Sequence, residues 1–268
     1  MPTTYEHTPP IQERAQSQAT VVNRAYAFVP KGASNDAAAR PLTGWTKSRA
    51  WIIAAPSKGF PDRFSQYSVE VHPGGGSRSP EPEPGVEAVV FLTGGTLQLT
   101  LDGGAHALEE GSYAYLAAGA DWTMHNASAK TAHFQWIRKA YIALDGHRAA
   151  SFVTTEREAE ATPNLGTNGS RSTTQFVAAD DLAHDMHVNI VTLQPNGSAA
   201  LTETHAMEHG IFVLSGSALY RLNEDWVRVQ AGDSLLLRAF CPQACHVTGP
   251  EEFRYLQYKE VNRQCRLT

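Results

Sequence analysis

Short segments in which apolar and polar residues alternate recur along most of the chain. Residues 64–71 and 96–101 alternate, as half-buried strands do, and residues 86–92 form a continuous apolar run typical of a buried strand. Asp102-Gly103-Gly104 predicts a hairpin turn. Strands at this spacing, separated by glycine-rich turns, indicate a β-sandwich or barrel rather than βαβ units.

A second series of strand-like segments follows the first. It comprises residues 187–193, 210–214, 218–222, 226–229, 234–237 and 253–259. Residues of the two series match at an offset of about 122 positions. The matches are Gly75 with Gly197, Glu87 with His209, Gly94 with Gly216 and Gly111 with Gly232. An internal repeat of this length predicts two similar β domains in tandem.

Two regions fall outside the repeat. Residues 1–50 are weakly patterned, with strand-like runs at 21–30 and 50–54, and they predict an N-terminal arm packed on the body or on a neighbouring subunit. Residues 151–175 are polar, have no apolar face, and predict a linker that could hold a short helix. We therefore expect an arm (1–50), a first barrel (51–150), a linker (151–175) and a second barrel (176–268).

Composition narrows the choice of partners and compartment. The 268-residue chain has a formal net charge of −5 and no basic block, so we expect neither nucleic acid nor an anionic membrane as a partner. No apolar run reaches the length of a membrane span, and the first residues form no apolar signal segment, which favours a cytoplasmic protein. Three cysteines cannot all pair, and we expect Cys241 and Cys245 to be buried free thiols rather than part of a soft-metal site with His246.

The strongest candidate chemistry lies in residues 195–216. Glu203, His205 and His209 have the same parity, so one extended strand would point all three side chains to one face. A carboxylate and two imidazoles suit a divalent metal such as Mn, Fe or Zn. Gly197 and Gly216 bracket this group with turns. The alternative is a polar strand face on which the histidines pair with carboxylates.

The matching positions of the first series carry different chemistry. They hold three carboxylates and an indole, which are Glu81, Glu83, Glu87 and Trp122. Carboxylates alone can bind a hard cation, but without a histidine they make a poor transition-metal site, and an indole cannot ligate. Prolines at 80, 82 and 84 indicate an irregular loop. We therefore expect a metal-free, structural first barrel.

The last strand of the second series offers further candidate side chains. Phe253, Tyr255, Gln257 and Lys259 share one parity. If Tyr255 points inward, Lys259 does too, and a phenol and a cation beside a metal make a natural seat for a carboxylate. The alternative is that Lys259 lies at the barrel rim and only reaches solvent.

The stretch from Gly197 to Gly216 resembles the first motif of the cupin family. It keeps the cupin spacing of glycine, five residues, Glu203-x-His205, three residues, His209, six residues and glycine, although glutamate and histidine are exchanged. In the second motif, Gln243 stands where a histidine is usual. The resemblance implies an all-β bicupin of two tandem jelly-roll β-barrels with an N-terminal arm.

The whole chain is similar to the (S)-ureidoglycine aminohydrolases, a family of bicupins. The similarity is carried by Glu203-Thr-His205-Ala-Met-Glu-His209-Gly, Leu214-Ser-Gly216, Gly232-Asp233, Gln243 and Tyr255-Leu-Gln-Tyr-Lys259. It implies a manganese ion (Mn2+) held by Glu203, His205, His209 and Gln243. It also implies that Glu203, Gln243, Tyr255 and Lys259 contact a ureide substrate. The implied reaction converts (S)-ureidoglycine and water to (S)-ureidoglycolate and ammonia, with Glu203 passing a proton to the leaving amine.

Two other functions fit the same residues. Glu203, His205 and His209 could supply the face of an iron-dependent bicupin dioxygenase, with Gln243 displaced. A bicupin that binds a small acid without turnover is the second alternative. We expect a homo-oligomer, because bicupins often assemble through their sheets and arms, and the sequence leaves its order and the metal in the cell open.

Overall fold

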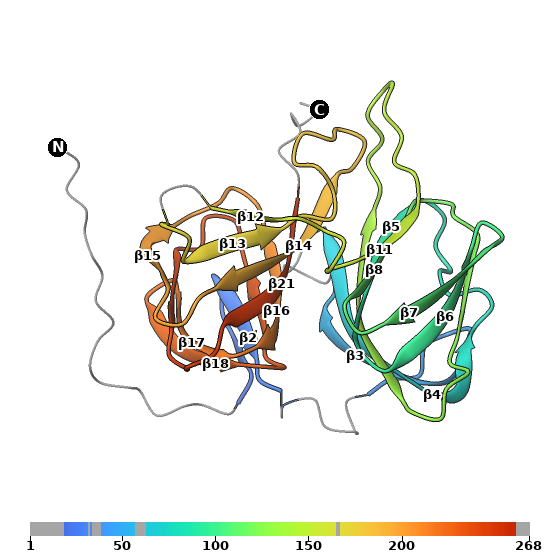
Figure 1. Cartoon of the computed structure of the whole chain (residues 1–268), viewed down its shortest axis with the longest axis horizontal. Coiled ribbons are helices and arrows are strands. Elements are labelled where there is room, and N and C mark those ends of the chain that lie inside the picture. Colours follow the sequence, from blue (N-terminus) through green and yellow to red (C-terminus); the bar gives the residue numbers. More distant parts are fainter. Residues whose placement is uncertain (1–18, 32, 34–38, 57–62, 165–166, 261–268) are drawn as a thin grey trace. The chain divides into compact units, whose positions relative to one another are not determined.

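The protein is built from β-strands throughout the part that the computed structural model describes, residues 19–31, 33, 39–56, 63–164 and 167–260. These residues form twenty-one strands joined by turns and loops (Figure 1). The described chain includes no helix with the length and apolar character needed to cross a bilayer. The expected all-β class is confirmed.

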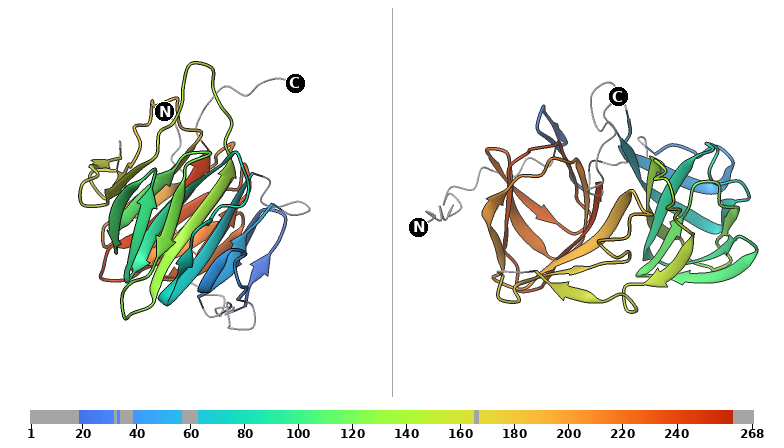
Figure 2. Two further views of the ribbon diagram at one scale, coloured as in Figure 1. Left: turned by 90° about the vertical axis from the view of Figure 1, so that its right-hand side faces the viewer. Right: turned by 90° about the horizontal axis from the view of Figure 1, so that it is seen from above.

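The chain divides into two compact units, each assembled from separate segments of the sequence. The described residues of 35–160 and 176–185 form one unit, which we call the first barrel. Those of 1–34, 161–175 and 186–260 form the other, the second barrel. In each unit the strands curve around an apolar interior (Figure 2).

The first barrel is a single curled sheet. Its strands are β3 (Trp45–Ala54), β4 (Phe64–Ser77), β5 (Val86–Gly94), β6 (Thr96–Leu101), β7 (Gly104–Glu109), β8 (Ser112–Leu116), β9 (Trp122–His125), β10 (Ala132–Ala140) and β11 (Phe152–Thr155). Their order is β11-β8-β5-β10-β4-β9-β6-β7, and β3 pairs with β4. The alternating sequence of β6 buries its leucines and exposes the residues between them. Trp45 lies within 6.5 Å of the ring centroids of Trp122, Phe134 and Trp136 in the interior.

The second barrel consists of two sheets. Its strands are β1 (Val21–Val22), β2 (Tyr26–Val29), β12 (Ala161–Pro163), β13 (Arg171–Thr174), β14 (Met186–Leu193), β15 (Ser198–Glu203), β16 (His209–Ser215), β17 (Ser217–Leu222), β18 (Asp225–Gln230), β19 (Ser234–Leu237), β20 (Gln243–Val247) and β21 (Phe253–Glu260). Eight of them follow the order β1-β2-β19-β16-β21-β14-β13-β12, and four follow β15-β20-β17-β18. Both sheets contribute side chains to one core, to which the free thiols of Cys241 and Cys245 belong.

The N-terminal segment completes the second barrel. Strand β2 pairs with β19, and the Tyr26 hydroxyl donates a 2.8 Å hydrogen bond to Asp225. The Asp233 carboxylate accepts hydrogen bonds from the backbone N–H groups of Lys31 and Gln230, both at 2.9 Å. The strands expected at 21–30 and 50–54 are confirmed, but they belong to different barrels. The described residues of the expected arm (1–50) are therefore divided between the two barrels.

The segment 151–175, expected as a linker, differs from that expectation. It contains β11, which pairs with β8 of the first barrel, and β12 and β13, which extend the sheet of the second barrel through β14. The segment looked unstructured because it has few apolar residues. Strands β11 and β12 lie at sheet edges and need few apolar residues, since each has only one neighbouring strand, and β13 is covered on its outer side only by the short strand β12.

The internal repeat predicted from the sequence is present in the structure. Gly216 and Gly95 have φ values of 75° and 76°, and both turn the chain into the strand that follows. A Cβ atom would lie 2.3 Å from the Glu252 carbonyl oxygen at Gly216 and 2.7 Å from that of Thr131 at Gly95, so both positions require glycine. The partner of Gly216 is therefore Gly95 rather than the predicted Gly94.

Candidate active site

Four side chains expected to bind a metal come together at one end of the second barrel. Glu203 is the last residue of β15 and lies opposite Gln243, the first residue of β20. His209 is the first residue of β16, and His205 lies in the loop between β15 and β16. The idea that one extended strand carries Glu203, His205 and His209 is therefore wrong, because the chain leaves the sheet after Glu203 and re-enters it at His209.

Direct contacts link three of these side chains. His205 Nε2 lies 3.5 Å from Glu203 Oε2. The ring centroids of His205 and His209 are 4.9 Å apart. The loop that carries His205 is held by the backbone N–H of Phe240, which donates to the His205 carbonyl oxygen at 2.6 Å.

Gln243 is oriented by the aromatic residues beneath it. The hydroxyl of Tyr220 donates a 2.8 Å hydrogen bond to Gln243 Oε1. Tyr220 packs edge-on against Tyr255 at 6.4 Å, and both rings are almost fully buried. This contact fixes the amide so that Oε1 keeps one lone pair free for another partner.

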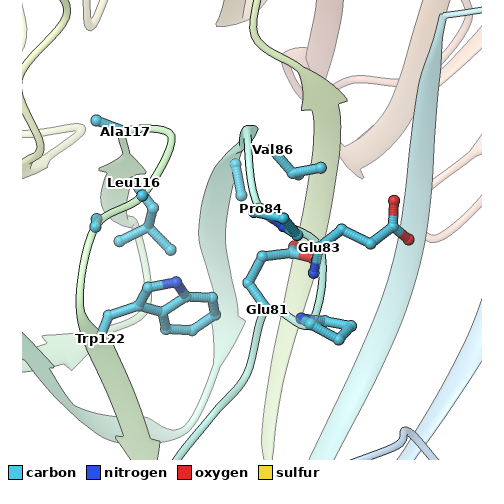
Figure 3. Close-up of a pocket in the computed structure, with 11 residues that line it drawn as sticks. Glu81, Glu83, Pro84, Val86, Leu116, Ala117 and Trp122 are labelled. Carbon is cyan, nitrogen blue, oxygen red and sulfur yellow. The ribbon is translucent and has the colours of Figure 1, made fainter.

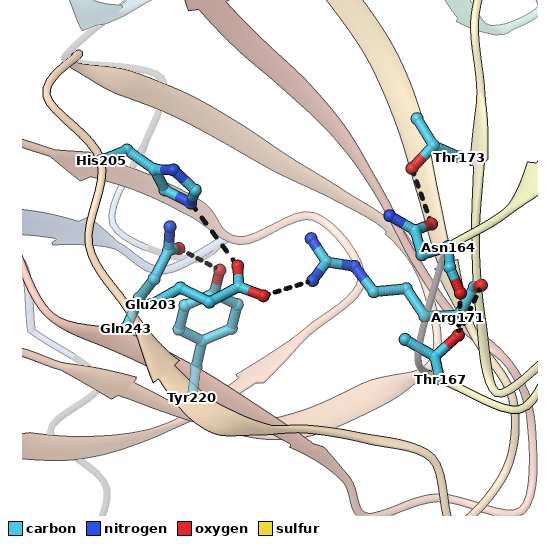
Figure 4. A network of polar contacts seen from close by, with 8 residues as sticks. All are labelled: Asn164, Thr167, Arg171, Thr173, Glu203, His205, Tyr220 and Gln243. Carbon is cyan, nitrogen blue, oxygen red and sulfur yellow. Dashed lines mark hydrogen bonds and ion pairs between the residues drawn. The ribbon is translucent and has the colours of Figure 1, made fainter. Parts of the chain in front are cut away.

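Arg171 also reaches this site, and no pattern in the sequence predicted it. Its Nη1 lies 3.0 Å from Glu203 Oε1, and only 15% of its side chain is exposed (Figure 4). Arg171 begins β13, inside the segment expected to be a linker. The run from Arg171 to Thr174 is polar throughout, so no alternation of apolar and polar residues marks it as a strand.

The last strand carries the other two expected site residues. Tyr255 lies in the core opposite Val191 and Val213, and Lys259 lies opposite His187 and His209. Burial, and then the charge of Arg171, lower the pKa of Lys259. Burial raises the pKa of Tyr255 to about 12, so its hydroxyl stays protonated at neutral pH.

The protonation states of the site favour metal ligands. Burial lowers the pKa of His209 to about 3, with the charges of His205 and Lys259 adding to the effect, so its imidazole is neutral at neutral pH. The contact with His205, and the charge of Arg171, hold the pKa of Glu203 below its usual value despite its burial. A neutral imidazole and an ionised carboxylate are the forms that bind a divalent cation.

The types of donor atom in this site therefore suit a divalent metal, but the side chains are not yet arranged around one point. Within the described residues, no three His, Cys, Asp or Glu side chains are gathered tightly enough to hold one ion. Glu203 gives one carboxylate oxygen to Arg171 and the other to His205. Ligation of one ion by all four side chains thus requires local rearrangement of Glu203.

The corresponding end of the first barrel holds a pocket of about 240 Å³. Trp122 and Leu116 lie on one side of it and Glu81, Pro84 and Val86 on the other (Figure 3). In sheet register, Trp122 lies opposite Leu101 as Gln243 lies opposite Leu222 in the second barrel. Apolar side chains and the acidic loop that carries Glu81 and Glu83 line the pocket together.

The two barrels also differ at the positions of His209 and Lys259. Ala88 lies opposite Leu116 and Arg138, as His209 lies opposite Leu237 and Lys259. The Arg138 guanidinium forms a two-pronged ion pair with Glu81, and Arg138 Nη2 lies 3.7 Å from Glu83 Oε1. The first barrel thus has alanine where the second has His209, and an arginine where the second has Lys259.

Glu87 does not occupy the position that the sequence alignment assigned to it. The first barrel is shifted by one residue here, and a shift of one residue moves a side chain to the other face of the sheet. Glu87 is completely buried on that face, where Tyr115 donates a 2.6 Å hydrogen bond to it and Asp185 shares another. Burial, then Asp185, raises the pKa of Glu87 to about 9. The placement of Glu87 among the ligand positions is therefore wrong.

Comparison with known proteins identifies the family. Residues 67–138 and 189–257 both match the family model of the cupin domain. The chain is 30% identical over 225 residues to a protein of Oryza sativa subsp. japonica named probable (S)-ureidoglycine aminohydrolase, which covers 83% of this chain and 70% of the rice protein. It is 28% identical over 227 residues to the (S)-ureidoglycine aminohydrolase of Escherichia coli (strain K12), covering 83% and 84% of the two chains.

A solved structure agrees over nearly the full length. The crystal structure of a Pseudomonas aeruginosa protein described as glyoxylate-induced has 48% sequence identity and a TM-score of 0.88, and the match covers 98% of this chain and 96% of that one. Two cupin domains, two barrels in one chain and the similarity to named relatives point the same way. The chain is a bicupin and belongs to the (S)-ureidoglycine aminohydrolase family.

Proposed function

We propose that this chain catalyses the manganese-dependent hydrolysis of (S)-ureidoglycine to (S)-ureidoglycolate and ammonia, in the breakdown of purine ureides. One observation carries the proposal. Glu203, His205, His209 and Gln243 meet at one end of the second barrel, in a chain whose relatives are named for this reaction. The four residues would hold the ion, which, when bound, supplies a Lewis acid that orients the substrate and acidifies water.

Lys259 and Tyr255 bind the carboxylate of the substrate in this proposal. The Tyr255 hydroxyl is protonated at neutral pH and can donate a hydrogen bond. Lys259 lies four residues after Tyr255 on the same face of β21, and its ammonium supplies the charge. Holding the carboxylate fixes which face of the reacting carbon meets water, and this accounts for a single product enantiomer.

Glu203 moves the proton. Its carboxylate is ionised at neutral pH and can accept a proton from the attacking water and pass it to the departing amine. The Gln243 amide, held through its oxygen by Tyr220, presents N–H donors to the ureido group. Each of these roles belongs to a side chain already positioned in the second barrel.

The test is a coupled assay of ammonia release. Allantoate amidohydrolase generates (S)-ureidoglycine from allantoate, and this protein is added with Mn²⁺ or with a chelator. We expect a faster second equivalent of ammonia that depends on the metal, together with one enantiomer of ureidoglycolate. His205→Ala is expected to abolish Mn²⁺ binding and turnover together.

The same preparations test the dioxygenase alternative. If ammonia release does not exceed spontaneous decay while Mn²⁺ is bound, the aminohydrolase proposal is overturned. Oxygen uptake with Fe²⁺, and none with Mn²⁺, would then favour the dioxygenase. Binding of small acids without any turnover would favour a binding protein.

A further inference from the structure

The open end of the second barrel has more positive than negative side chains. Arg171 pairs with Glu203 at 3.0 Å. Lys259 lies close enough to Arg171 for that charge to lower its pKa. Across the described part of the chain, no carboxylate lies within ion-pair distance of the Lys259 ammonium. Two cations thus share one carboxylate, which leaves a site suited to a further anion.

Arg171 has donor capacity that the protein does not use. Its Nε–H is buried and has no hydrogen-bond acceptor among the described residues. Buried donors in native proteins nearly always have a partner, so this one indicates an acceptor supplied from elsewhere. A guanidinium presents paired N–H groups that match the two oxygens of a carboxylate.

The first barrel shows the opposite balance at the same place. Arg138, in the register position of Lys259, faces two carboxylates, Glu81 and Glu83. The carboxylates of that barrel therefore pair with a cation on β10, at the position that corresponds to Lys259 on β21. In the second barrel the arginine comes from β13 instead, and Lys259 has no acidic partner among the described residues.

We propose that Arg171 is a further substrate-binding residue, whose guanidinium turns from Glu203 to grip the substrate carboxylate together with Lys259. This inference rests on the proposed function for the identity of the ligand. Glu203 neutralises Arg171 until the substrate arrives, and the substrate carboxylate then replaces it. The exchange also leaves Glu203 Oε1 free to accept the proton.

The experiment measures binding of two matched probes by calorimetry to the Mn²⁺-loaded protein. The probes are N-carbamoylglycine, which has the ureido and carboxylate groups but no leaving amine, and its primary amide, which lacks the negative charge. Arg171→Gln is expected to weaken the acid about 10- to 100-fold and the amide less than about twofold, because a charge-assisted pair is lost only for the acid. Arg171→Lys is expected to restore part of the affinity. Arg49→Gln, which removes a 2.8 Å pair with Glu70 in the first barrel, is the matched control and changes neither.

The outcomes separate this inference from a purely structural role. If Arg171 only orients Glu203, Arg171→Gln weakens Mn²⁺ binding and both probes alike, and the inference is overturned. Unchanged affinity for the acid overturns it as well. In steady-state assays Arg171→Gln should raise KM more than it lowers kcat.

The two proposals can fail separately. If the wild type releases no ammonia but binds the acid through Arg171, the proposed reaction is wrong and the binding of the carboxylate by Arg171 is supported. If the wild type turns over substrate and Arg171→Gln keeps the same KM, the proposed reaction is supported and the binding of the substrate carboxylate by Arg171 is overturned.

Discussion

The two barrels share a register and differ in the residues that stand at its open end. The second barrel has Glu203, His209 and Lys259 where the first has its acidic loop, Ala88 and Arg138. In the first barrel the arginine and the carboxylates satisfy one another. In the second, a neutral imidazole, an ionised carboxylate and an ammonium without an ion-pair partner among the described residues remain available. This difference supports the proposal that the second barrel carries the chemistry while the first has a structural role.

The largest expected effect compares the two glutamates. Glu203→Gln removes the group that we propose moves the proton, and we expect kcat to fall by about 10²–10⁴-fold. Glu81→Gln changes a carboxylate in the acidic loop of the first barrel and should leave kcat unchanged. Both variants are assayed for metal-dependent ammonia release after equal Mn²⁺ loading. An equal loss of kcat in both would break the distinction between the barrels.

The next comparison concerns the cation on the last strand. Lys259→Met is expected to raise KM about 10- to 100-fold with a smaller effect on kcat, because a charged hydrogen bond to the substrate is lost. Arg138→Met, at the same register position of the first barrel, should leave KM unchanged. The measurement is a full substrate titration of each variant. An unchanged KM for Lys259→Met would place the carboxylate elsewhere.

The acidic loop of the first barrel should matter for stability rather than for catalysis. Glu81→Ala leaves the Arg138 guanidinium with only its 3.7 Å contact to Glu83, at a place where only 12% of the Arg138 and Glu81 side chains is exposed, and we expect a loss of roughly 3 kcal/mol in the free energy of unfolding. Glu83→Ala removes a carboxylate that is 70% exposed and 3.7 Å away, and should cost less than about 1 kcal/mol. Urea denaturation of both variants tests this ranking. Equal losses would show that Glu81 has no special structural role.

The last prediction concerns a pH dependence at Glu87. Its pKa is raised from 4.5 to about 9 by burial and then by Asp185, so the folded protein keeps this proton where the unfolded chain has lost it. The folded state then binds more protons, and this group makes stability fall as pH rises from about 4.5 to about 9. Glu87→Gln, which mimics the protonated form, should therefore gain in Tm over the wild type as pH rises. Glu110→Gln, at an exposed site, serves as the control, and a pH-independent difference for Glu87→Gln would contradict the assignment.

Much of the fold could be predicted because the signals are local. Alternation and glycine turns identify strands, and the repeat of glycines at a fixed offset identifies two barrels. What the sequence does not show is which strands pair across long distances. Residues 26–29 pair with β19 more than two hundred positions away, and no local pattern records such a partnership.

For the site, the sequence indicated which residues lie near one another better than it indicated which strands and loops carry them. Glu203, His205 and His209 were identified from their spacing and Gln243 from the resemblance to cupins, yet the four residues come from three strands (β15, β16 and β20) and a loop rather than from one face of one strand. Arg171 was missed because a charged residue in a polar segment carries no pattern of its own. Glu87 was misplaced because a difference of one residue between the repeats reverses the face of a strand.

The central claim is that the second barrel alone carries the metal. The most direct measurement is the stoichiometry and affinity of Mn²⁺ binding to the whole chain, by calorimetry and electron paramagnetic resonance. We expect one Mn²⁺ ion per chain. His205→Ala should lose this ion, and Glu81→Gln should retain it. Two ions per chain, or one ion that disappears with Glu81→Gln and survives His205→Ala, would contradict it.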